Sequence, residues 1–310
     1  MLSRHLWYYK TNWNLHDRSK MKNIVIITPV YNDWESFTKL INEINKVISG
    51  FKDISFSLIA VNDGSKEKVP SLSLPSHLKM IEILNMRINQ GHAICIANGI
   101  KYALKNYQFD NLILMDADGE DRPEEITDLI NKARELQNVS VVAKRVKRSE
   151  GPIFTFFYSL HKLLTLIFTG KLMNFGHYSL ITKNDSETII KEPTIIYCFA
   201  STLKNKITNL GNINCIRGKR YFGPSKMSLF KLIIHSFSII AVFKMNVFIR
   251  SALFLVLLSY LQTYIGMISP ILQIMIVMFN IFIYIISTKS NEKILKNMDF
   301  ELEDTEKVTH

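Results

Sequence analysis

The sequence predicts an α/β domain with a mostly parallel sheet, followed by an interfacial helix and a hairpin of two membrane-spanning helices. Two observations lead to this fold class. From residue 22 to residue 143, short β-branched runs alternate with stretches of helical periodicity, as in parallel sheets that helices cover on both faces. Near the C-terminus, two neighbouring stretches of about 18 residues carry no charge, and a helix of that length nearly crosses a bilayer.

The elements of the α/β domain follow from its apolar pattern. Five short apolar runs are expected to form strands: Asn23–Val30, Phe56–Val61, Lys79–Leu84, Asn111–Met115 and Val139–Ala143. One helix is expected over residues 37–48 and a second over residues 93–104, because apolar residues recur there at helical spacing. A third helix opens at Pro123, where the missing N–H of proline costs nothing. In such sheets, ligands bind beyond the carboxyl ends of the strands.

The basic residues are concentrated in one part of the chain. Lys and Arg number 38 against 27 Asp and Glu, which gives a net charge of +11. Between Glu192 and Glu292 there is no acidic residue, and ten basic residues lie there: Lys204, Lys206, Arg217, Lys219, Arg220, Lys226, Lys231, Lys244, Arg250 and Lys289. Because this stretch borders the apolar spans, its charge favours an anionic membrane surface as partner, and nucleic-acid binding is not expected. The three cysteines lack the spacing of a zinc cluster or a disulfide framework.

The two uncharged stretches are Ser251–Ile268 and Pro270–Thr288. Buried core helices are the alternative reading, but two neighbouring segments this apolar are unusual in one soluble domain. The turn is expected at Ser269 and Pro270, so both outer ends lie on one side of the membrane. Lys and Arg flank these ends, and the positive-inside rule therefore places them and the first 245 residues in the cytoplasm. Residues 1–20 are too polar for a signal peptide.

The chain is thus expected to have five parts. Residues 1–21 form a leader whose order the sequence leaves open, and residues 22–227 form the α/β domain. Residues 228–246 are expected to be an interfacial amphipathic helix, and residues 247–288 the two transmembrane helices. Residues 289–310 are an acidic tail with six acids from residue 292 onward, expected to be a solvated helix or disordered.

Polar residues gather at three predicted strand ends. They are residues 28–33 (TPVYND), 61–65 (VNDGS) and 116–121 (DADGED). In the third motif, four carboxylates within six residues repel one another unless a cation neutralises them, and hard oxygen ligands suit Mg²⁺ or Mn²⁺. The twelve-residue spacing of an EF-hand and the glycine-lysine pattern of a P-loop are both missing.

Taken in order, these motifs resemble family 2 glycosyltransferases, whose GT-A fold is Rossmann-like. The sequence is similar to the branch that contains dolichyl-phosphate mannose synthases and bacterial polyprenyl-phosphate glycosyltransferases. Residues 145–148 (RVKR) before an aromatic-rich helix, and residues 220–226 (RYFGPSK), also match this branch, as does a C-terminal two-helix anchor. The resemblance covers about residues 22–290.

The resemblance implies which residues bind the donor and the metal ion. A nucleotide-sugar, linked to UDP or GDP, would lie against Pro29, Tyr31, Asn32, Asp33, Asp63, Gly64, Ser65 and Asp116. Asp116, Asp118 and Glu120 would hold Mg²⁺ or Mn²⁺ on the donor diphosphate, with Asp118 also catalytic. Glu120 departs from the Gln of many relatives but remains a metal ligand. His177 stands where many relatives have Asp, and no role is assigned to it.

The remaining expected site residues serve the phosphates of the two substrates. By the resemblance, one loop would close over the donor diphosphate with Arg220, Ser225 and Lys226. Arg145 and Arg148 are expected to bind the phosphate of a polyprenyl-phosphate acceptor, since Arg suits bidentate phosphate contacts. Such a phosphate is already ionised near neutral pH and needs no strong base.

Two alternatives stay open at this stage. Transfer to a lipid-linked saccharide would need a carboxylate base, and Asp121 or another acid early in the chain is the candidate. An inactive membrane-bound scaffold protein is the other alternative, and the intact acidic motif argues against it. The sequence also leaves homo-oligomerisation open.

Overall fold

The computed structural model describes residues 21–147, 152–223, 229–288 and 302–309. The strands are β1 (Asn23–Val30), β2 (Ser55–Asn62), β3 (Leu78–Met86), β4 (Asn111–Leu114), β5 (Val141–Lys147), β6 (Phe175–Thr182), β7 (Gly211–Ile216) and β8 (Leu302–Val308). The helices are α2 (Trp34–Ile48), α3 (His92–Asn106), α4 (Glu125–Glu135), α5 (Pro152–Thr169), α6 (Lys183–Ile189), α7 (Phe199–Lys206), α8 (Leu229–Ala241), α9 (Lys244–Ile265) and α10 (Ile268–Thr288), with a short 3₁₀ helix η1 (Pro193–Ile196).

One mixed sheet organises the α/β domain. Within the described residues its eight strands run in the order β7-β5-β6-β4-β1-β2-β3-β8. β1 is parallel to β2 and β4, β2 to β3, and β5 to β7. β6 is antiparallel to β4 and β5, and β8 is antiparallel to β3. The five predicted strands are present with ends shifted by a few residues, and β6, β7 and β8 are additional. The predicted α/β fold with a mainly parallel sheet is confirmed.

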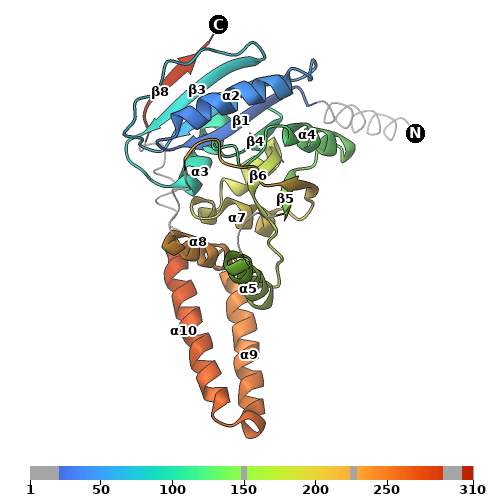
Figure 1. Cartoon of the computed structure of the whole chain (residues 1–310). Helices are drawn as coiled ribbons and strands as arrows, with labels where there is room; N and C mark the ends of the chain where they lie inside the picture. The colour runs from blue at the N-terminus through green and yellow to red at the C-terminus, as the bar shows by residue number, and fades with distance from the viewer. Residues whose placement is uncertain (1–20, 148–151, 224–228, 289–301, 310) are drawn as a thin grey trace, which may run out of the picture.

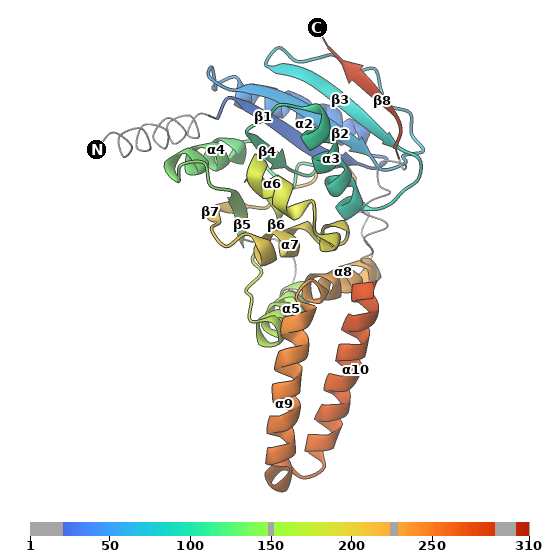
Figure 2. The same cartoon turned by 180° about the vertical axis from the view of Figure 1, so that it is seen from behind.

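Helices cover both faces of this sheet (Figures 1 and 2). In β1, Ile24 and Ile26 point to one core, which α2 and α4 complete, and Val25 and Ile27 point to the other, which α3, α6 and α7 complete. This alternation is the period of two that a strand imposes. Both faces of β1 and β2 are buried along nearly their whole length, and their central residues are mostly apolar, as expected of parallel strands.

Two long apolar helices, α9 and α10, form a hairpin that extends away from the α/β domain (Figure 1). Both are long and apolar enough to cross a membrane, and only 11% and 17% of their most apolar stretches are buried. The predicted turn at Ser269 and Pro270 is wrong by a few residues. α9 ends before Gly266, which has a φ of 55°, so Ser269 and Pro270 lie in the first turn of α10. A proline is tolerated there because no intrahelical donor is lost.

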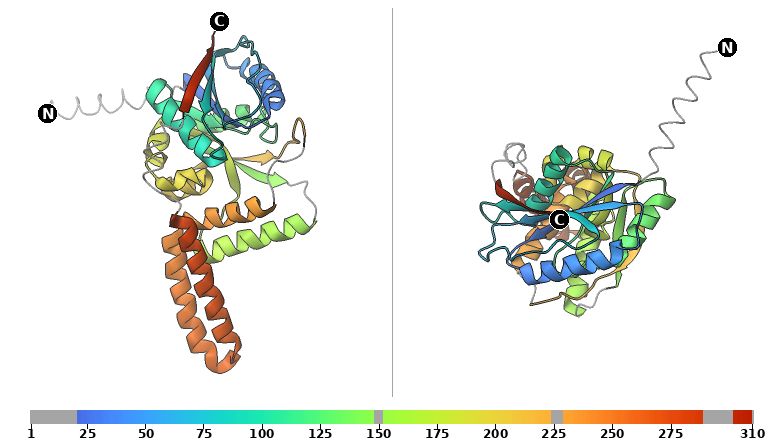
Figure 3. Two further views of the ribbon diagram at one scale, coloured as in Figure 1. Left: turned by 90° about the vertical axis from the view of Figure 1, so that its left-hand side faces the viewer. Right: turned by 90° about the horizontal axis from the view of Figure 1, so that it is seen from above.

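α5 and α8 lie across the base of the hairpin, between it and the sheet (Figure 3). The C-terminal carbonyls of α5 accept hydrogen bonds from α9: Asn246 Nδ2 donates to Thr169 O at 3.0 Å and Arg250 Nη1 to Ile167 O at 3.2 Å. A cation at a helix C-terminus also complements the helix dipole. The hairpin is therefore fixed to α5 by polar contacts as well as by apolar packing. The predicted helix over residues 228–246 ends at Ala241, and its last residues belong to α9.

The end of the acidic tail is a strand and not the helix or disordered segment that its composition indicated. β8 pairs antiparallel with β3, with Asp304 opposite Asn85 and Val308 opposite Ile81. It lies at the edge of the sheet (Figure 2). An edge strand with five exposed residues has no apolar pattern of its own, so its pairing depends on β3.

Candidate active site

The three polar motifs meet at one edge of the sheet. β1 lies between β2 and β4 and is parallel to both, with Pro29 opposite Val61 and Ile27 opposite Leu114. The carboxyl ends of the three strands therefore lie side by side, where open α/β sheets bind ligands. The sequence prediction that these motifs form one site is consistent with this arrangement.

Hydrogen bonds tie the loop after β1 to the loop after β2. The Asn32 N–H donates to Ser65 Oγ at 2.9 Å, and Asn32 Oδ1 accepts from the N–H groups of Lys66 and Glu67 at 2.8 and 3.3 Å. Asn32 has a φ of 48°, a region that asparagine tolerates better than most residues. Gly64 has a φ of 62°, and a Cβ there would lie 2.6 Å from the backbone of Ile88. Glycine is therefore required in this loop.

Asp63 is buried at the end of β2 and organises a third loop. Its Oδ1 accepts from the N–H of Gln90 at 2.7 Å, and its Oδ2 accepts from the N–H of Gly91 at 3.0 Å and from Asn89 Nδ2 at 2.9 Å. Burial raises the pKa of this carboxyl, and the hydrogen bonds from Gln90 and Gly91 oppose the rise. In the structure, Asp63 holds the loop that leads into α3, next to the position where the resemblance implies a nucleotide.

The acidic motif after β4 is folded onto a loop that follows β7. The N–H of Gly218 donates to Glu120 O and the N–H of Tyr221 donates to Asp118 O, both at 2.8 Å. Gly119, where relatives often have Leu, has a φ of 87°, and a Cβ there would lie 2.7 Å from the Tyr221 ring. The glycine is therefore explained by the close approach of this aromatic ring.

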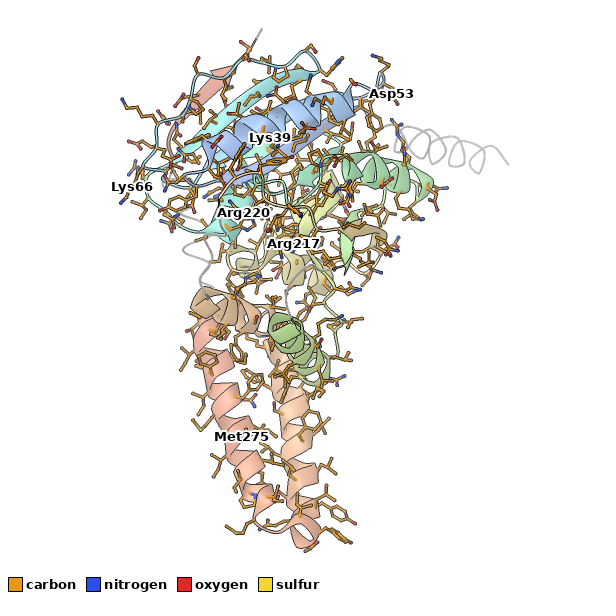
Figure 4. The ribbon with its side chains drawn as sticks, viewed as in Figure 1. Lys39, Asp53, Lys66, Arg217, Arg220 and Met275 are labelled. Carbon is orange, nitrogen blue, oxygen red and sulfur yellow. The ribbon has the colours of Figure 1, made fainter. Side chains whose placement is uncertain are left out.

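Arginines of the same loop neutralise the carboxylates. Arg220 pairs with Asp118 through Nη1 and with Asp33 through Nη2, the latter at 2.5 Å. Arg217 Nε donates to Glu120 Oε2 at 2.9 Å. Figure 4 shows both arginines between α2 and the helices α5 and α8, on the side of the domain that faces the hairpin. Arg220 thus joins the first polar motif to the third.

Two partly buried acids of the cluster, Asp116 and Asp118, repel each other. Burial, and next the negative charge of Asp116, raise the pKa of Asp118 to about 7, and the nearby Arg220 only partly offsets this. A divalent cation would relieve this repulsion, so the set of oxygen donors fits the expected Mg²⁺ or Mn²⁺. The assignment of Asp116, Asp118 and Glu120 as metal ligands stays a prediction.

Two histidines that the sequence prediction did not use complete the cluster. His92 Nε2 lies 2.8 Å and His177 Nε2 lies 3.1 Å from Asp116 Oδ1, and His177 Nε2 is also 3.1 Å from Asp121 Oδ2. Ligand atoms of His92, Asp116 and His177 all lie within 4.8 Å of one another, as in a metal site. Burial would lower the pKa of His177, but the charges of Asp116 and Asp121 outweigh it and raise the pKa to about 10.

The position of His177 follows from strand pairing. β6 is antiparallel to β4, with Leu114 opposite Ser179, so two further residues along each strand bring Asp116 opposite His177. The pairing of β6 with β4 would have predicted this contact, but no local pattern in the sequence indicates which strand β6 joins.

Asp121 and Arg145 form a buried pair beside this cluster. Asp121 Oδ2 accepts from the N–H of Asp116 at 3.0 Å, and Arg145 Nη2 lies 3.3 Å from Asp121 Oδ1. Tyr31 is partly exposed at the rim, and Pro29 lies within β1. Arg148, Ser225 and Lys226 lie outside the described residues. The structure therefore brings together most of the predicted residues, with Arg145 close to Asp121 and not free in solvent.

Comparison with known proteins identifies the family. The family model described as "Glycosyl transferase family 2" matches residues 25–210. An uncharacterized glycosyltransferase from Synechocystis is 32% identical over 127 residues, which are 40% of this chain and 38% of that protein. The undecaprenyl-phosphate 4-deoxy-4-formamido-L-arabinose transferase of Salmonella choleraesuis is 28% identical over 233 residues, which are 71% of this chain and 67% of that protein. The matched region thus spans well under half of the first relative.

Solved structures share the fold. Mannosyl-3-phosphoglycerate synthase from Rubrobacter xylanophilus aligns with a TM-score of 0.51 at 15% identity, covering 74% of this chain and 75% of that chain. Glucosyl-3-phosphoglycerate synthase from Mycobacterium tuberculosis, in complex with Mn²⁺, UDP and phosphoglyceric acid, aligns with a TM-score of 0.52 at 14% identity, covering 76% and 82%. At these identities the likeness concerns the fold alone, and it confirms the expected GT-A-like architecture. With the family match over residues 25–210, the chain belongs to glycosyl transferase family 2.

Proposed function

We propose that this chain transfers a sugar from a nucleotide-sugar to a polyprenyl phosphate at a membrane surface. The observation that carries the proposal is the bridge of Arg220 between Asp33 and Asp118. It brings the loop expected to bind the nucleotide next to the acidic cluster expected to bind a cation. A site for a nucleotide diphosphate needs these two parts side by side.

The acidic cluster is the proposed metal site. Asp116, Asp118 and Glu120 would hold Mg²⁺ or Mn²⁺. The nearby His92 and His177 would join them as ligands only in their neutral forms, and the raised pKa of His177 disfavours that form near neutral pH. When bound, the ion would stabilise the negative charge that develops on the leaving diphosphate. The glucosyl-3-phosphoglycerate synthase of similar fold was solved with Mn²⁺ and UDP, which supports this choice of ion and a UDP-linked donor, while a GDP-linked donor stays the alternative.

Arg217 and Arg220 are proposed to act on the donor. In the structure their guanidinium groups neutralise Glu120 and Asp118. Arg forms bidentate contacts with phosphate oxygens as readily as with carboxylates. They would therefore orient the diphosphate and oppose its growing charge, together with Ser225 and Lys226 of the same loop.

The acceptor is proposed to carry a phosphate. The Salmonella relative is named for transfer to undecaprenyl phosphate, and Arg145 precedes α5, whose Leu160, Leu163 and Leu166 are exposed. Transfer to a lipid-linked saccharide would need a free carboxylate base. Asp121 is a poor candidate because it is 2% exposed and already contacts Arg145 and His177. A phosphate acceptor avoids this need, since it is ionised near neutral pH.

The membrane is proposed to receive α9 and α10, with the α/β domain in the cytoplasm. β8 follows α10 and pairs with β3 of the α/β domain. The chain must therefore leave the hairpin on the side on which it enters, which supports an even number of spans. Basic residues flank the hairpin, and the positive-inside rule assigns that side to the cytoplasm.

A transfer assay with purified full-length protein tests the proposal. Labelled UDP-sugars and GDP-sugars are offered with Mn²⁺ and one of three acceptors: polyprenyl phosphate, the free polyprenol or a lipid-linked saccharide. The expected result is a labelled, metal-dependent product with polyprenyl phosphate alone. Equal transfer to the lipid-linked saccharide would show that the phosphate is not recognised and would overturn the acceptor assignment.

A further inference from the structure

A continuous series of side-chain hydrogen bonds joins the C-terminal strand β8 to the proposed donor loops. Asn85 Nδ2, on β3, donates to Asp304 Oδ1 at 2.6 Å and to Glu306 Oε1 at 3.0 Å. Asn85 Oδ1 accepts from Asn62 Nδ2 at 2.8 Å. Asn62 Oδ1 in turn accepts from the N–H of Ser65 at 3.1 Å. The series begins on β8 and ends in the loop after β2.

The series continues into the loop after β1. Ser65 Oγ accepts from the N–H of Asn32 at 2.9 Å, and Asn32 Oδ1 accepts from the N–H groups that follow Ser65. Asn62 is buried, and the next residue is Asp63, which holds the loop over residues 89–91. The series therefore reaches the loops after β1 and β2 directly, and it ends next to Asp63, which holds the third loop.

The direction of each amide in the series is set at its two ends, by the carboxylates of β8 and by the N–H of Ser65. A carboxamide has one acceptor end and one donor end, and a carboxylate can only accept. Asp304 and Glu306 therefore fix Asn85 with Nδ2 toward β8 and Oδ1 toward Asn62. Asn62 must then present Nδ2 to Asn85 and Oδ1 to Ser65. Without the two carboxylates, a rotated Asn85 would oppose two NH₂ groups, and the contact of Asn62 with the loop would weaken.

Other contacts hold β8 in place independently of these two acids. Backbone pairing with β3 extends from Met86 to Ile81. Lys307 Nζ lies 3.3 Å from Glu82 Oε1, and the same carboxylate, which is fully buried, accepts from Tyr102 Oη at 2.7 Å. Substitutions at residues 304 and 306 should therefore change the hydrogen-bond series without releasing the strand.

We propose that β8 is a positioning element of the donor site: through Asn85, Asp304 and Glu306 orient the loops that contain Asn32, Asp63 and Ser65 for binding the nucleotide. The inference rests on the proposed function, because it needs the nucleotide to bind in these loops. It gives a role in donor binding to the segment that follows the membrane hairpin.

The test is nucleotide binding by the full-length protein, measured by calorimetry with UDP or GDP in the presence of Mn²⁺. Asp304→Ala combined with Glu306→Ala should weaken binding by about 3- to 10-fold, as for the net loss of about one hydrogen bond, because the two acids act on the nucleotide only through Asn85 and Asn62. Glu303→Ala is the matched control, because Glu303 is an exposed acid of β8 next to Asp304 and is not an acceptor of Asn85 Nδ2. The control should bind the nucleotide as the wild type does.

A set of variants in which hydrogen-bond donors and acceptors are exchanged provides a rescue. Asn85→Asp removes both donors and places a third carboxylate beside Asp304 and Glu306, so binding should fall further. Adding Asp304→Asn and Glu306→Gln supplies amide donors to the new carboxylate, which still accepts from Asn62, and binding should recover. In transfer assays the donor KM should change with the binding constant, while kcat and the acceptor KM stay within about twofold.

Three outcomes would count against the inference in different ways. If the wild type binds neither nucleotide, the proposed function itself is wrong. If the wild type binds and the Asp304→Ala, Glu306→Ala protein binds equally well, the positioning role is wrong. If that variant loses kcat and melting temperature at an unchanged donor KM, β8 is a structural strand and has no role in donor binding.

Discussion

The two halves of the candidate site are held together by different forces. On the donor side, Asn32, Asp63 and Ser65 are fixed by hydrogen bonds with backbone N–H groups of neighbouring loops. On the acidic side, Asp118 and Glu120 are neutralised by Arg220 and Arg217. Backbone donors leave the loops fixed whether or not a ligand is bound. The ion pairs, in contrast, can exchange a guanidinium for a metal ion, so we infer that the acidic side changes partners when the donor binds.

The largest effect is expected from Asp118→Asn, which breaks the acidic side. The loss of a charged metal ligand should lower the transfer rate by about 100- to 1,000-fold, as for other groups that stabilise developing charge. The measurement is steady-state transfer with Mn²⁺. Glu124→Gln is the control, since Glu124 is an exposed acid near the same motif. A wild-type rate in Asp118→Asn, or full activity in EDTA, would contradict the proposed role of a metal ion in the transfer.

The second largest effect is expected on the use of the acceptor, from Arg148→Ala. If Arg148 binds a lipid phosphate, the loss of a charged hydrogen bond should reduce acceptor kcat/KM by about 10- to 150-fold, with donor KM unchanged. Arg148→Lys should retain only part of the acceptor kcat/KM, because lysine keeps the charge but lacks the planar guanidinium group. Kinetics with varied polyprenyl phosphate measure both values. A change below about twofold would indicate a solvated arginine.

The pH dependence of Mn²⁺ binding tests the acidic side of the site separately from the donor side. Because the pKa of Asp118 is raised to about 7 in the folded protein, Mn²⁺ must displace a proton below that pH. Its affinity should rise about tenfold per pH unit up to about pH 7 and then level off. The same carboxyl makes the ligand-free protein less stable as pH rises from about 4 to about 7, since the folded state binds the proton more tightly.

Two titrations measure these effects. Mn²⁺ affinity is followed by electron paramagnetic resonance across pH, and the melting temperature of the ligand-free protein is compared with that of Asp118→Asn. The variant should gain stability relative to the wild type as pH rises through this range. Mn²⁺ affinity that is flat between about pH 5 and pH 8 would contradict the raised pKa.

The smallest effect is expected on the donor side, from Asn32→Ala. The variant removes the acceptor for the N–H groups of Lys66 and Glu67, so the donor KM should rise by about 3- to 10-fold at an unchanged kcat. Asn32→Gly tests the backbone contribution, because the φ of 48° suits glycine better than alanine. A large fall in kcat instead would mean that Asn32 acts on the acidic side.

The difference between the two halves also explains what the sequence could predict. β1, β2 and β4 are buried on both faces, so their composition alone indicates strands, and the polar residues at their ends indicate a site. The partners of the acids could not be read in this way. Arg217 and Arg220 follow β7 about a hundred residues later, and His177 reaches Asp116 only through the register of β6 with β4.

The C-terminal strand β8, in contrast, could not be predicted from the sequence. Leu302–Val308 contains three acids and one lysine, and most of its side chains are exposed. Its stability comes from backbone pairing with β3 and from contacts with Asn85 and Glu82, which are more than 200 residues away in sequence. Neither the β-propensity of this segment nor its hydrophobic pattern indicates these contacts. The turn of the hairpin was misplaced for a related reason, since Gly266 ends α9 before the proline that marked the expected turn.

The most direct test of the account is the dependence of nucleotide binding on the metal ion. In the proposed site, the donor loops and the acidic cluster form one unit, joined through Asp33, Arg220 and Asp118. Calorimetry of the wild type with UDP and with GDP should therefore show binding of one of them with Mn²⁺, much weaker binding in EDTA, and the same weakness in Asp118→Asn with Mn²⁺. Equally tight nucleotide binding in all three conditions would show that the two halves are separate, and would contradict the account.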